Sequence, residues 1–219
     1  MNPDQWRTYL VTQQSLSAGR STVDIVEAAI EGGVDAVQLR EKDVSARERY
    51  ALGRRLRERT RAAGVDLIVN DRVDLAAAID ADGVHLGQSD LPVAAARDLL
   101  GEDAIVGVSS GSVAEAAAAA DAGADYLGVG AIYGTTSKPD ADTANDGLGL
   151  EALADIAAAV SIPVVAIGGI TADNAAPTVD AGATAVAVIS AITAADAPAT
   201  AAADLRAAVG DTPEVSADV

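Results

Sequence analysis

Eight short apolar segments alternate along the chain with segments of helical periodicity, and this alternation predicts an α/β protein that folds as a single (β/α)8 barrel of the TIM type. Strands that are buried on both faces are continuously apolar, and strands that alternate with helices pair in parallel through right-handed crossovers. Eight strand-helix units fit within about 210 residues. An open, doubly wound sheet is the alternative, because hydrophobic periodicity does not show whether a sheet closes.

The elements follow in a regular order. The predicted strands cover Thr8–Gln13, Ala36–Arg40, Leu67–Asn70, Gly83–Leu86, Ile105–Ser109, Tyr126–Gly130, Val164–Ile167 and Ala185–Ser190. Helical periodicity fills the intervals, for example in Val23–Ile30, Ala46–Ala63, Val113–Ala122, Leu150–Val160 and Ala199–Val209. A glycine stands between helix and strand at Gly33, Gly64, Gly83, Gly123 and Gly182, as expected for helices that end at glycine.

The pattern continues without a linker, so we expect one catalytic domain over residues 1–210. Residues 211–219 are polar, and we expect this C-terminal tail to be frayed. The opening MNPDQWRTYLVTQ lacks a basic segment followed by an apolar one, which predicts that there is no signal peptide. No apolar run approaches the roughly 20 residues of a membrane span. With no cysteine in the chain, we expect a cytoplasmic protein without disulfides or thiolate metal sites.

The net charge is strongly negative, with 15 Lys and Arg against 33 Asp and Glu and a formal charge of −18. This balance argues against a nucleic-acid partner, because phosphate backbones are bound by basic surfaces. The charges are interspersed with apolar periodic segments, which favours a folded chain over a disordered one. At about 1 M salt the Debye length falls to about 3 Å and self-repulsion is screened. We therefore hypothesise a halophilic, salt-adapted protein.

The polar residues that follow the strands converge on one rim, where barrels of this type carry their active sites. The only two lysines, Lys42 and Lys138, both lie there, together with Arg40. A cluster of positive side chains at the barrel rim of a negatively charged protein predicts a phosphate-bearing ligand. Solvated cations that balance nearby carboxylates are the alternative.

Two carboxylates, Asp71 and Asp90, follow adjacent strands, so that both could bind one Mg²⁺ together with substrate oxygens. Each could instead be a helix N-cap. Gly168-Gly169 and Ile189-Ser190 follow the last two strands, where barrels often hold a phosphate, and a tight strand-to-helix turn is the alternative explanation of the glycines. The only histidine, His85, lies within a strand and is expected to be a wall residue rather than a general base.

Taken together, these segments resemble the thiamine-phosphate synthase family. The resemblance covers Thr8 to Ala194 in the order TYLVTQ, DAVQLREKD, LIVNDRVDLA, ADGVHLGQSDL, VGVSS, GADYLGVGAIYGTTSKPDA, IPVVAIGGIT and AVAVISAI. It implies a TIM-type barrel and a Mg²⁺-dependent transferase of thiamine biosynthesis. Such enzymes join hydroxymethylpyrimidine diphosphate to hydroxyethylthiazole phosphate and release diphosphate by a dissociative mechanism. The implied partners are these small substrates alone, and a homo-oligomer is left open.

The resemblance also assigns residues. It implies that the pyrimidine diphosphate is bound by Gln38, Leu39, Arg40, Glu41, Lys42, Asn70, Ser109 and Lys138, of which Arg40, Lys42, Ser109 and Lys138 are catalytic. The implied thiazole phosphate site consists of Thr135, Thr136, Ser137, Gly169, Ile189 and Ser190, and the implied Mg²⁺ ligands are Asp71 and Asp90. The chain departs from the family at Gly111, where a His is frequent, and at Gly134, where a proline is common.

Other functions fit less well. A thiazole tautomerase paralogue keeps the barrel but tends to lose the diphosphate and metal residues, which are retained here. A non-catalytic sensor of phosphate ligands would have no use for them. A sugar-phosphate isomerase needs a positioned acid and base, and the sequence offers no convincing pair.

Overall fold

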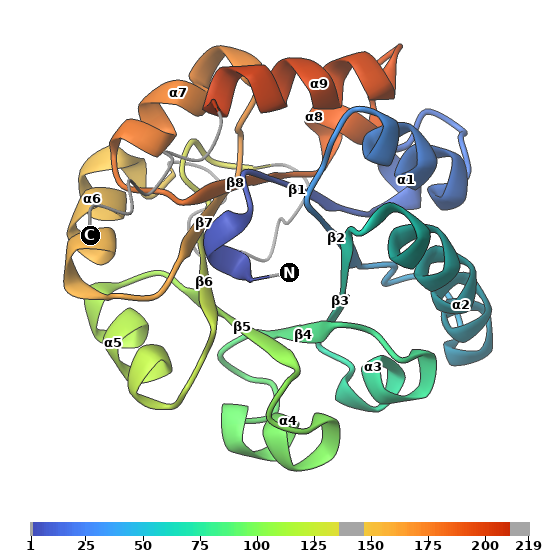
Figure 1. Ribbon diagram of the computed structural model, residues 1–219. Helices are drawn as coiled ribbons and strands as arrows, with labels where there is room; N and C mark the ends of the chain where they lie inside the picture. Colours follow the sequence, from blue (N-terminus) through green and yellow to red (C-terminus); the bar gives the residue numbers. More distant parts are fainter. Residues whose placement is uncertain (1, 136–146, 211–219) are drawn as a thin grey trace, which may run out of the picture.

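The computed structural model describes residues 2–135 and 147–210 and contains a closed barrel of eight parallel strands in chain order (Figure 1). Closure is made by β1 and β8, which pair with Thr8 opposite Val186. The predicted barrel is therefore confirmed, and the open sheet is excluded. The strands are β1 (Thr8–Val11), β2 (Ala36–Leu39), β3 (Asp66–Asn70), β4 (Gly83–Leu86), β5 (Ile105–Ser110), β6 (Tyr126–Gly130), β7 (Val164–Ile167) and β8 (Ala185–Val188).

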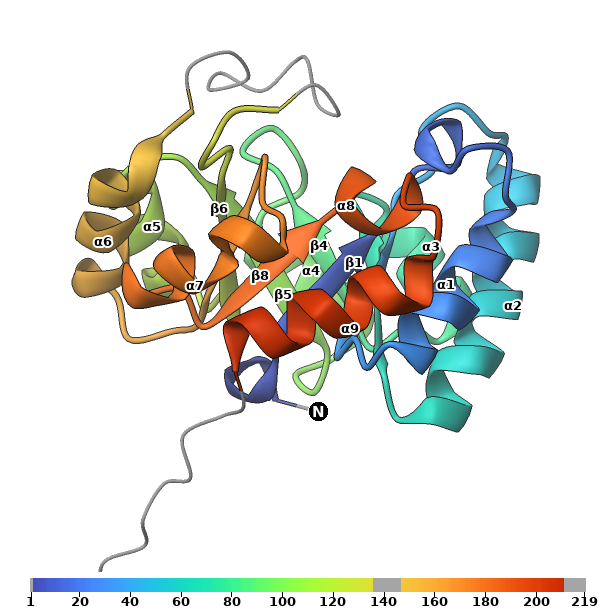
Figure 2. The same cartoon turned by 90° about the horizontal axis from the view of Figure 1, so that it is seen from above.

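Helices form a ring outside the barrel (Figures 1 and 2). They are α1 (Thr22–Glu31), α2 (Ala46–Ala63), α3 (Val73–Ile79), α4 (Val93–Leu100), α5 (Val113–Asp121), α6 (Gly149–Ala159), α7 (Ala172–Asp180), α8 (Ser190–Thr193) and α9 (Pro198–Val209), with short 3-10 turns η1 (Pro3–Gln5) and η2 (Gln14–Leu16). None of these helices, within the residues described, has the length and apolar character needed to cross a membrane.

Three strands end earlier than the sequence predicts: β2 stops at Leu39, one residue before Arg40, and the two larger differences are at β1 and β8. β1 was expected to reach Gln13 but ends at Val11, because the chain turns into η2 at Gln14. β8 was expected to include Ser190, which instead begins α8, since Ile189 leaves the extended conformation at φ −111° and ψ −85°. In both cases the polar residues start the loop rather than finish the strand.

The longest helix, α2, shows how local sequence sets the element boundaries. Ser45 and Glu48 form a capping box in which each side chain accepts a hydrogen bond from the other residue's backbone N–H. The helix ends at Gly64, which has a φ of 69°, a left-handed conformation that glycine adopts without steric cost. These signals explain why the predicted bounds of this helix match the structure.

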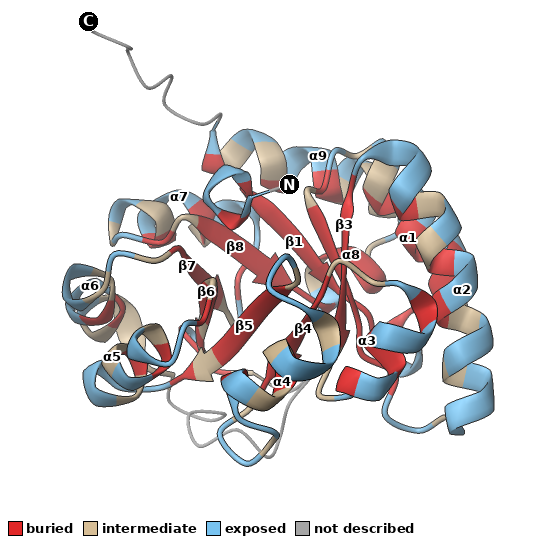
Figure 3. Ribbon diagram, turned by 60° about the horizontal axis from the view of Figure 1, so that its bottom comes forward, coloured by how far each residue is buried: buried red, intermediate tan, exposed pale blue. Residues whose placement is uncertain are grey.

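Apolar side chains fill two layers. The larger layer lies between the barrel and the helices, and Figure 3 shows buried strands beneath helices that are exposed on their outer faces. The smaller layer lies inside the barrel and is closed at the N-terminal end by Trp6, whose ring packs edge-on against Tyr9 and Tyr126. The indole N–H of Trp6 donates to Asp66 at 2.8 Å. With that end filled, ligand access is left to the end where the strands finish.

Candidate active site

Four charged side chains gather where β2, β3 and β4 end: Arg40, Lys42, Asp71 and Asp90. Partial burial raises the pKa of Asp71, and the negative charge and hydrogen bond of Asp90 raise it further. The positive charges of Lys42 and Arg40 lower the same pKa by smaller amounts. The two carboxylates are therefore close neighbours, as the sequence predicted, and the two cations lie within electrostatic reach of them.

The backbone aims both carboxylates at one place. Asp71 adopts a left-handed φ of 62°, which is uncommon outside glycine but tolerated by Asp, and its N–H donates to the His85 carbonyl at 2.9 Å. Asp90 folds back over its own loop, and its Oδ2 accepts from the Gly87 N–H at 2.7 Å. Neither residue is the N-cap of a helix, since α3 is capped by Arg72 and α4 by Pro92.

Arg40 is held in place before any ligand arrives. The residue is 5% exposed, and its Nη1 donates to Oε1 of Gln13 at 2.8 Å. Its backbone N–H donates to the Thr12 hydroxyl at 3.0 Å. These contacts come from the loop after β1, so that the guanidinium is oriented by the neighbouring strand. Lys42, in contrast, is exposed.

Two other predicted contacts with the pyrimidine diphosphate turn their side chains elsewhere. Leu39 belongs to the apolar layer outside the barrel, where it faces Gly53 of α2. The Glu41 carboxylate accepts from the Thr22 hydroxyl at 2.8 Å and from the Gln14 N–H at 3.0 Å. It therefore joins the loop after β2 to η2 and α1, so both side chains make contacts within the protein.

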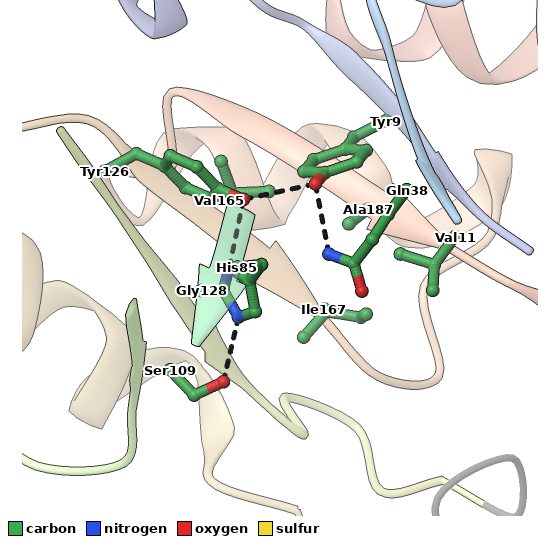
Figure 4. Close-up of a pocket in the computed structure, with 10 residues that line it drawn as sticks. All are labelled: Tyr9, Val11, Gln38, His85, Ser109, Tyr126, Gly128, Val165, Ile167 and Ala187. Carbon is green, nitrogen blue, oxygen red and sulfur yellow. Dashed lines mark hydrogen bonds between the residues drawn. The ribbon is translucent and has the colours of Figure 1, made fainter. Parts of the chain in front are cut away.

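A pocket opens inside the barrel below these charges (Figure 4). Its lining is partly polar and includes Tyr9, Gln38, His85, Ser109 and Tyr126, together with apolar residues of β7 and β8. Gln38 and Ser109 were predicted site residues, and His85 was expected in the wall, where it lies. The two tyrosines were not singled out from the sequence. The signal available was their position on inward-facing sites of β1 and β6, but only the strand registers show that the two lie at one level.

The exits of β7 and β8 have a different character. Gly168 and Gly169 have φ values of 103° and 68°, and a Cβ on Gly169 would lie 2.8 Å from Cβ of Tyr133. The glycines therefore let the loop after β7 approach the segment that follows β6. Ile189 is buried, and Ser190 is exposed at the start of α8. Thr135 is partly buried, whereas Thr136, Ser137 and Lys138 lie outside the described residues, as does the tail 211–219.

Known proteins resemble this chain along nearly its whole length. The family model described as "Thiamine monophosphate synthase" matches residues 8–192. The chain belongs to this family. A thiamine-phosphate synthase from Haloarcula marismortui is 62% identical over 204 residues, which cover 93% of this chain and 97% of the relative. One from Moorella thermoacetica is 53% identical, with 94% and 96% covered.

The solved structures agree with the barrel. Thiamine phosphate pyrophosphorylase from Pyrococcus furiosus superposes with a TM-score of 0.86 at 40% identity, covering 94% of this chain and 96% of that one. A 3-hexulose-6-phosphate synthase superposes with a TM-score of 0.70 at 17% identity, over 93% and 100% of the two chains. The second likeness shows the fold alone. Membership in the thiamine monophosphate synthase family therefore rests on sequence and on the closer structure together.

At one of the two departures from the family pattern, the backbone has a local role. The N–H of Gly111 donates to Oε2 of Glu115 at 2.6 Å, so this residue helps to start α5. Gly134, the other departure, has a left-handed φ of 77°. A proline cannot adopt that angle, so the loop after β6 takes a different path here than a proline would allow.

Proposed function

We propose that this protein is a transferase that joins hydroxymethylpyrimidine diphosphate to hydroxyethylthiazole phosphate, giving thiamine phosphate and diphosphate. The observation that carries the proposal is the gathering of Asp71 and Asp90 with Arg40 and Lys42 at one rim of a barrel of the thiamine monophosphate synthase family. A phosphate-ligand sensor or a tautomerase would not need two carboxylates and two cations around a leaving group.

The carboxylate pair fits a divalent cation. The charge of Asp90 raises the pKa of Asp71 because neighbouring carboxylates repel, and a bound cation removes that repulsion. Among the described residues no cluster of three or more acidic or histidine side chains occurs. Mg²⁺ typically accepts one or two protein carboxylates and takes its other ligands from phosphate oxygens and water. Asp71 and Asp90 would hold Mg²⁺, which neutralises diphosphate charge when bound.

The residues of the chain then act on the leaving group. In the proposed reaction, the bond between the pyrimidine methylene carbon and the diphosphate oxygen breaks, and its electron pair leaves with diphosphate. Arg40 and Lys42 stabilise the negative charge that grows on those oxygens, and Lys138 is included on its sequence motif. Gln38, Asn70 and Ser109 hold the pyrimidine, which remains in the site as a resonance-stabilised cation. The thiazole nitrogen captures that cation, so no side-chain nucleophile is needed.

The second substrate is assigned to the opposite part of the rim. We place the thiazole phosphate against Thr135, Gly169, Ile189 and Ser190, and extend this site to Thr136 and Ser137 on their sequence motif. The close approach of the loop after β7 to the segment after β6 supports this placement, because it puts two of the assigned segments side by side. A cytoplasmic location is predicted from the sequence, which leaves the oligomeric state open.

The test is product formation by the purified protein. Thiamine phosphate and diphosphate are expected only with both substrates and Mg²⁺, and the salt-adaptation hypothesis predicts more product in molar KCl than at low salt. A folded protein that gives no product at any salt would contradict the proposal. Isomerisation of the thiazole phosphate alone would then identify a tautomerase.

A further inference from the structure

A chain of hydrogen bonds crosses the barrel beneath the rim (Figure 4). The Gln38 amide nitrogen donates to the Tyr9 hydroxyl at 3.0 Å, and the hydroxyls of Tyr9 and Tyr126 are 3.1 Å apart. The Tyr126 hydroxyl is 3.0 Å from His85 Nδ1, and His85 Nε2 is 2.9 Å from the Ser109 hydroxyl. The five side chains come from five strands and join two proposed substrate contacts, Gln38 and Ser109, from within.

Two glycines leave room for the aromatic rings of this hydrogen-bond chain. A Cβ on Gly107 would lie 2.1 Å from the Tyr126 ring, and a Cβ on Gly128 would lie 2.6 Å from the His85 ring. Both glycines therefore make room for the rings. Burial raises the pKa of the Tyr9 and Tyr126 phenols, so each keeps its one proton and can donate once.

With the Gln38 amide nitrogen facing Tyr9, counting protons gives the hydrogen-bond chain one direction. The Gln38 nitrogen has no lone pair to offer, so Tyr9 accepts there. The Tyr126 hydroxyl, 3.1 Å away, is then the acceptor that we assign to the Tyr9 proton. Tyr126 in turn donates to Nδ1 of His85. The imidazole is then neutral and protonated at Nε2, from which it donates to the Ser109 oxygen. The Ser109 hydroxyl proton is left for an acceptor that is not one of these five side chains.

At the other end of the hydrogen-bond chain, Gln38 offers an acceptor rather than a donor. The Gln38 side-chain oxygen is buried, has no hydrogen-bond partner among the described residues, and points away from Tyr9 toward Ile167 (Figure 4). A buried carbonyl without a partner costs about 1–3 kcal/mol, so the site favours a ligand that supplies an N–H or O–H there. Turning the amide over would leave two N–H donors at that point instead and would reverse every bond in the chain.

We propose that Tyr9, Tyr126 and His85 form a directional relay that holds His85 in its Nε2–H tautomer and so fixes Gln38 as an acceptor and Ser109 as a donor toward the ligand. The three are positioning residues that act through the two ends. They select a planar ligand that offers a donor on one side and an acceptor on the other. An aminopyrimidine has this pattern, and only that identification rests on the proposed function.

The relay is tested by ¹⁵N NMR of the imidazole in protein labelled at histidine. Because His85 is the only histidine, the two ring-nitrogen signals need no assignment by mutation. We expect a neutral ring with the proton on Nε2 in the protein without substrates. A ring protonated on Nδ1, or on both nitrogens, would overturn the relay. The spectrum involves no turnover, so failure here is separate from failure of the proposed reaction.

Two variants sharpen this test. Tyr126→Phe removes the donor to Nδ1, so we expect the Nδ1 signal to shift toward that of a mixture of tautomers. Tyr50→Phe is the matched control, since Tyr50 is exposed on α2, and its spectrum is expected to equal that of the wild type. If Tyr126→Phe folds and leaves both signals unmoved, the relay does not set the tautomer. If it does not fold, the wild-type spectrum alone decides.

Discussion

The two sides of the rim use different chemistry. Where β2, β3 and β4 end, the chain presents Arg40, Lys42, Asp71 and Asp90, whose charges act on one another. Where β7 and β8 end, it presents Gly169, Ile189 and Ser190, with glycine angles and close packing in place of charge. One side is therefore suited to a group whose charge changes during the reaction, and the other to a group that only needs to be held.

This difference matches the two phosphates of the proposed reaction. The diphosphate leaves, so its growing charge must be met by cations and a metal that are already in place. The thiazole phosphate stays on the product, so it is sufficient to bind it equally well in the substrate complex and in the transition state. Substitutions on the charged side should then lower kcat, and those on the glycine side should raise KM.

The largest effect is expected from Arg40→Gln. Removing the preset guanidinium should lower kcat by about 10²–10³, the loss typical of a donor aimed at developing charge. Steady-state kinetics with both substrates saturating would measure it. Arg72→Gln is the control, because Arg72 lies at the same end of β3 but pairs with Asp74 on the surface. It should change kcat little, as expected for an exposed ion pair. Equal losses in the two variants would contradict the role of Arg40.

A second test removes one carboxylate. Asp90→Asn keeps the oxygen that accepts from Gly87 but loses the charge. The Mg²⁺ concentration for half-maximal activity should rise about 10–100-fold, the loss typical even of groups behind metal ligands. The melting temperature without Mg²⁺ should stay equal or rise, since the repulsion with Asp71 is gone. Asp74→Asn, on the surface of α3, is the control and should leave the Mg²⁺ requirement unchanged.

The glycine side is tested by Gly169→Ala. The residue has a left-handed φ of 68°, and its Cβ would meet Tyr133. We expect a loss of about 1–3 kcal/mol in unfolding free energy, together with a higher KM for the thiazole phosphate and an unchanged kcat. Gly123→Ala has the same kind of strain at φ 88° but no atom within 4 Å of the added Cβ. Gly123→Ala should lose stability without a change in the KM for the thiazole phosphate. A raised KM in this variant would show that backbone strain, and not the contact with Tyr133, is what raises KM.

The smallest effect concerns pH. The pKa of Asp71 is raised in the folded protein, so the native state holds that proton more tightly than the unfolded chain does. Without Mg²⁺, stability should therefore fall as pH rises between the ordinary and the raised pKa. Mg²⁺ competes with the proton, so its stabilising effect should grow over the same interval. Melting temperatures with and without Mg²⁺ at pH about 4.5 and about 7.5 would check this; a Mg²⁺ effect independent of pH would count against Asp71 as a ligand.

The sequence predicted the barrel because strand and helix alternate, and because ends such as Gly64 are marked locally. Closure between β1 and β8 was not visible, since it depends on pairing between residues at opposite ends of the chain. The same reason explains the site. Asp71 and Asp90 were placed together correctly, because both follow neighbouring strands. Glu41 looked like a rim residue, but its side chain is held by Thr22 and Gln14.

The interior chain from Gln38 to Ser109 was missed for a related reason. Which residue of each strand faces inward is fixed by parity, but which inward residues share a level depends on the stagger between strands. His85 and Tyr126 come from strands that are not paired with each other, and they meet across β5 because both are in register with Gly107, which has no side chain between them. A lone histidine within a strand was the one local signal, and it indicates a wall residue without naming its partners.

The most direct test of the division between the two sides is the rate of diphosphate release in a single turnover, with enzyme in excess and the thiazole phosphate saturating. Arg40→Gln is expected to slow this step, whereas Gly169→Ala is expected to match the wild type. Equal slowing by both substitutions would contradict the assignment of diphosphate departure to the charged side and of thiazole phosphate binding to the glycine side.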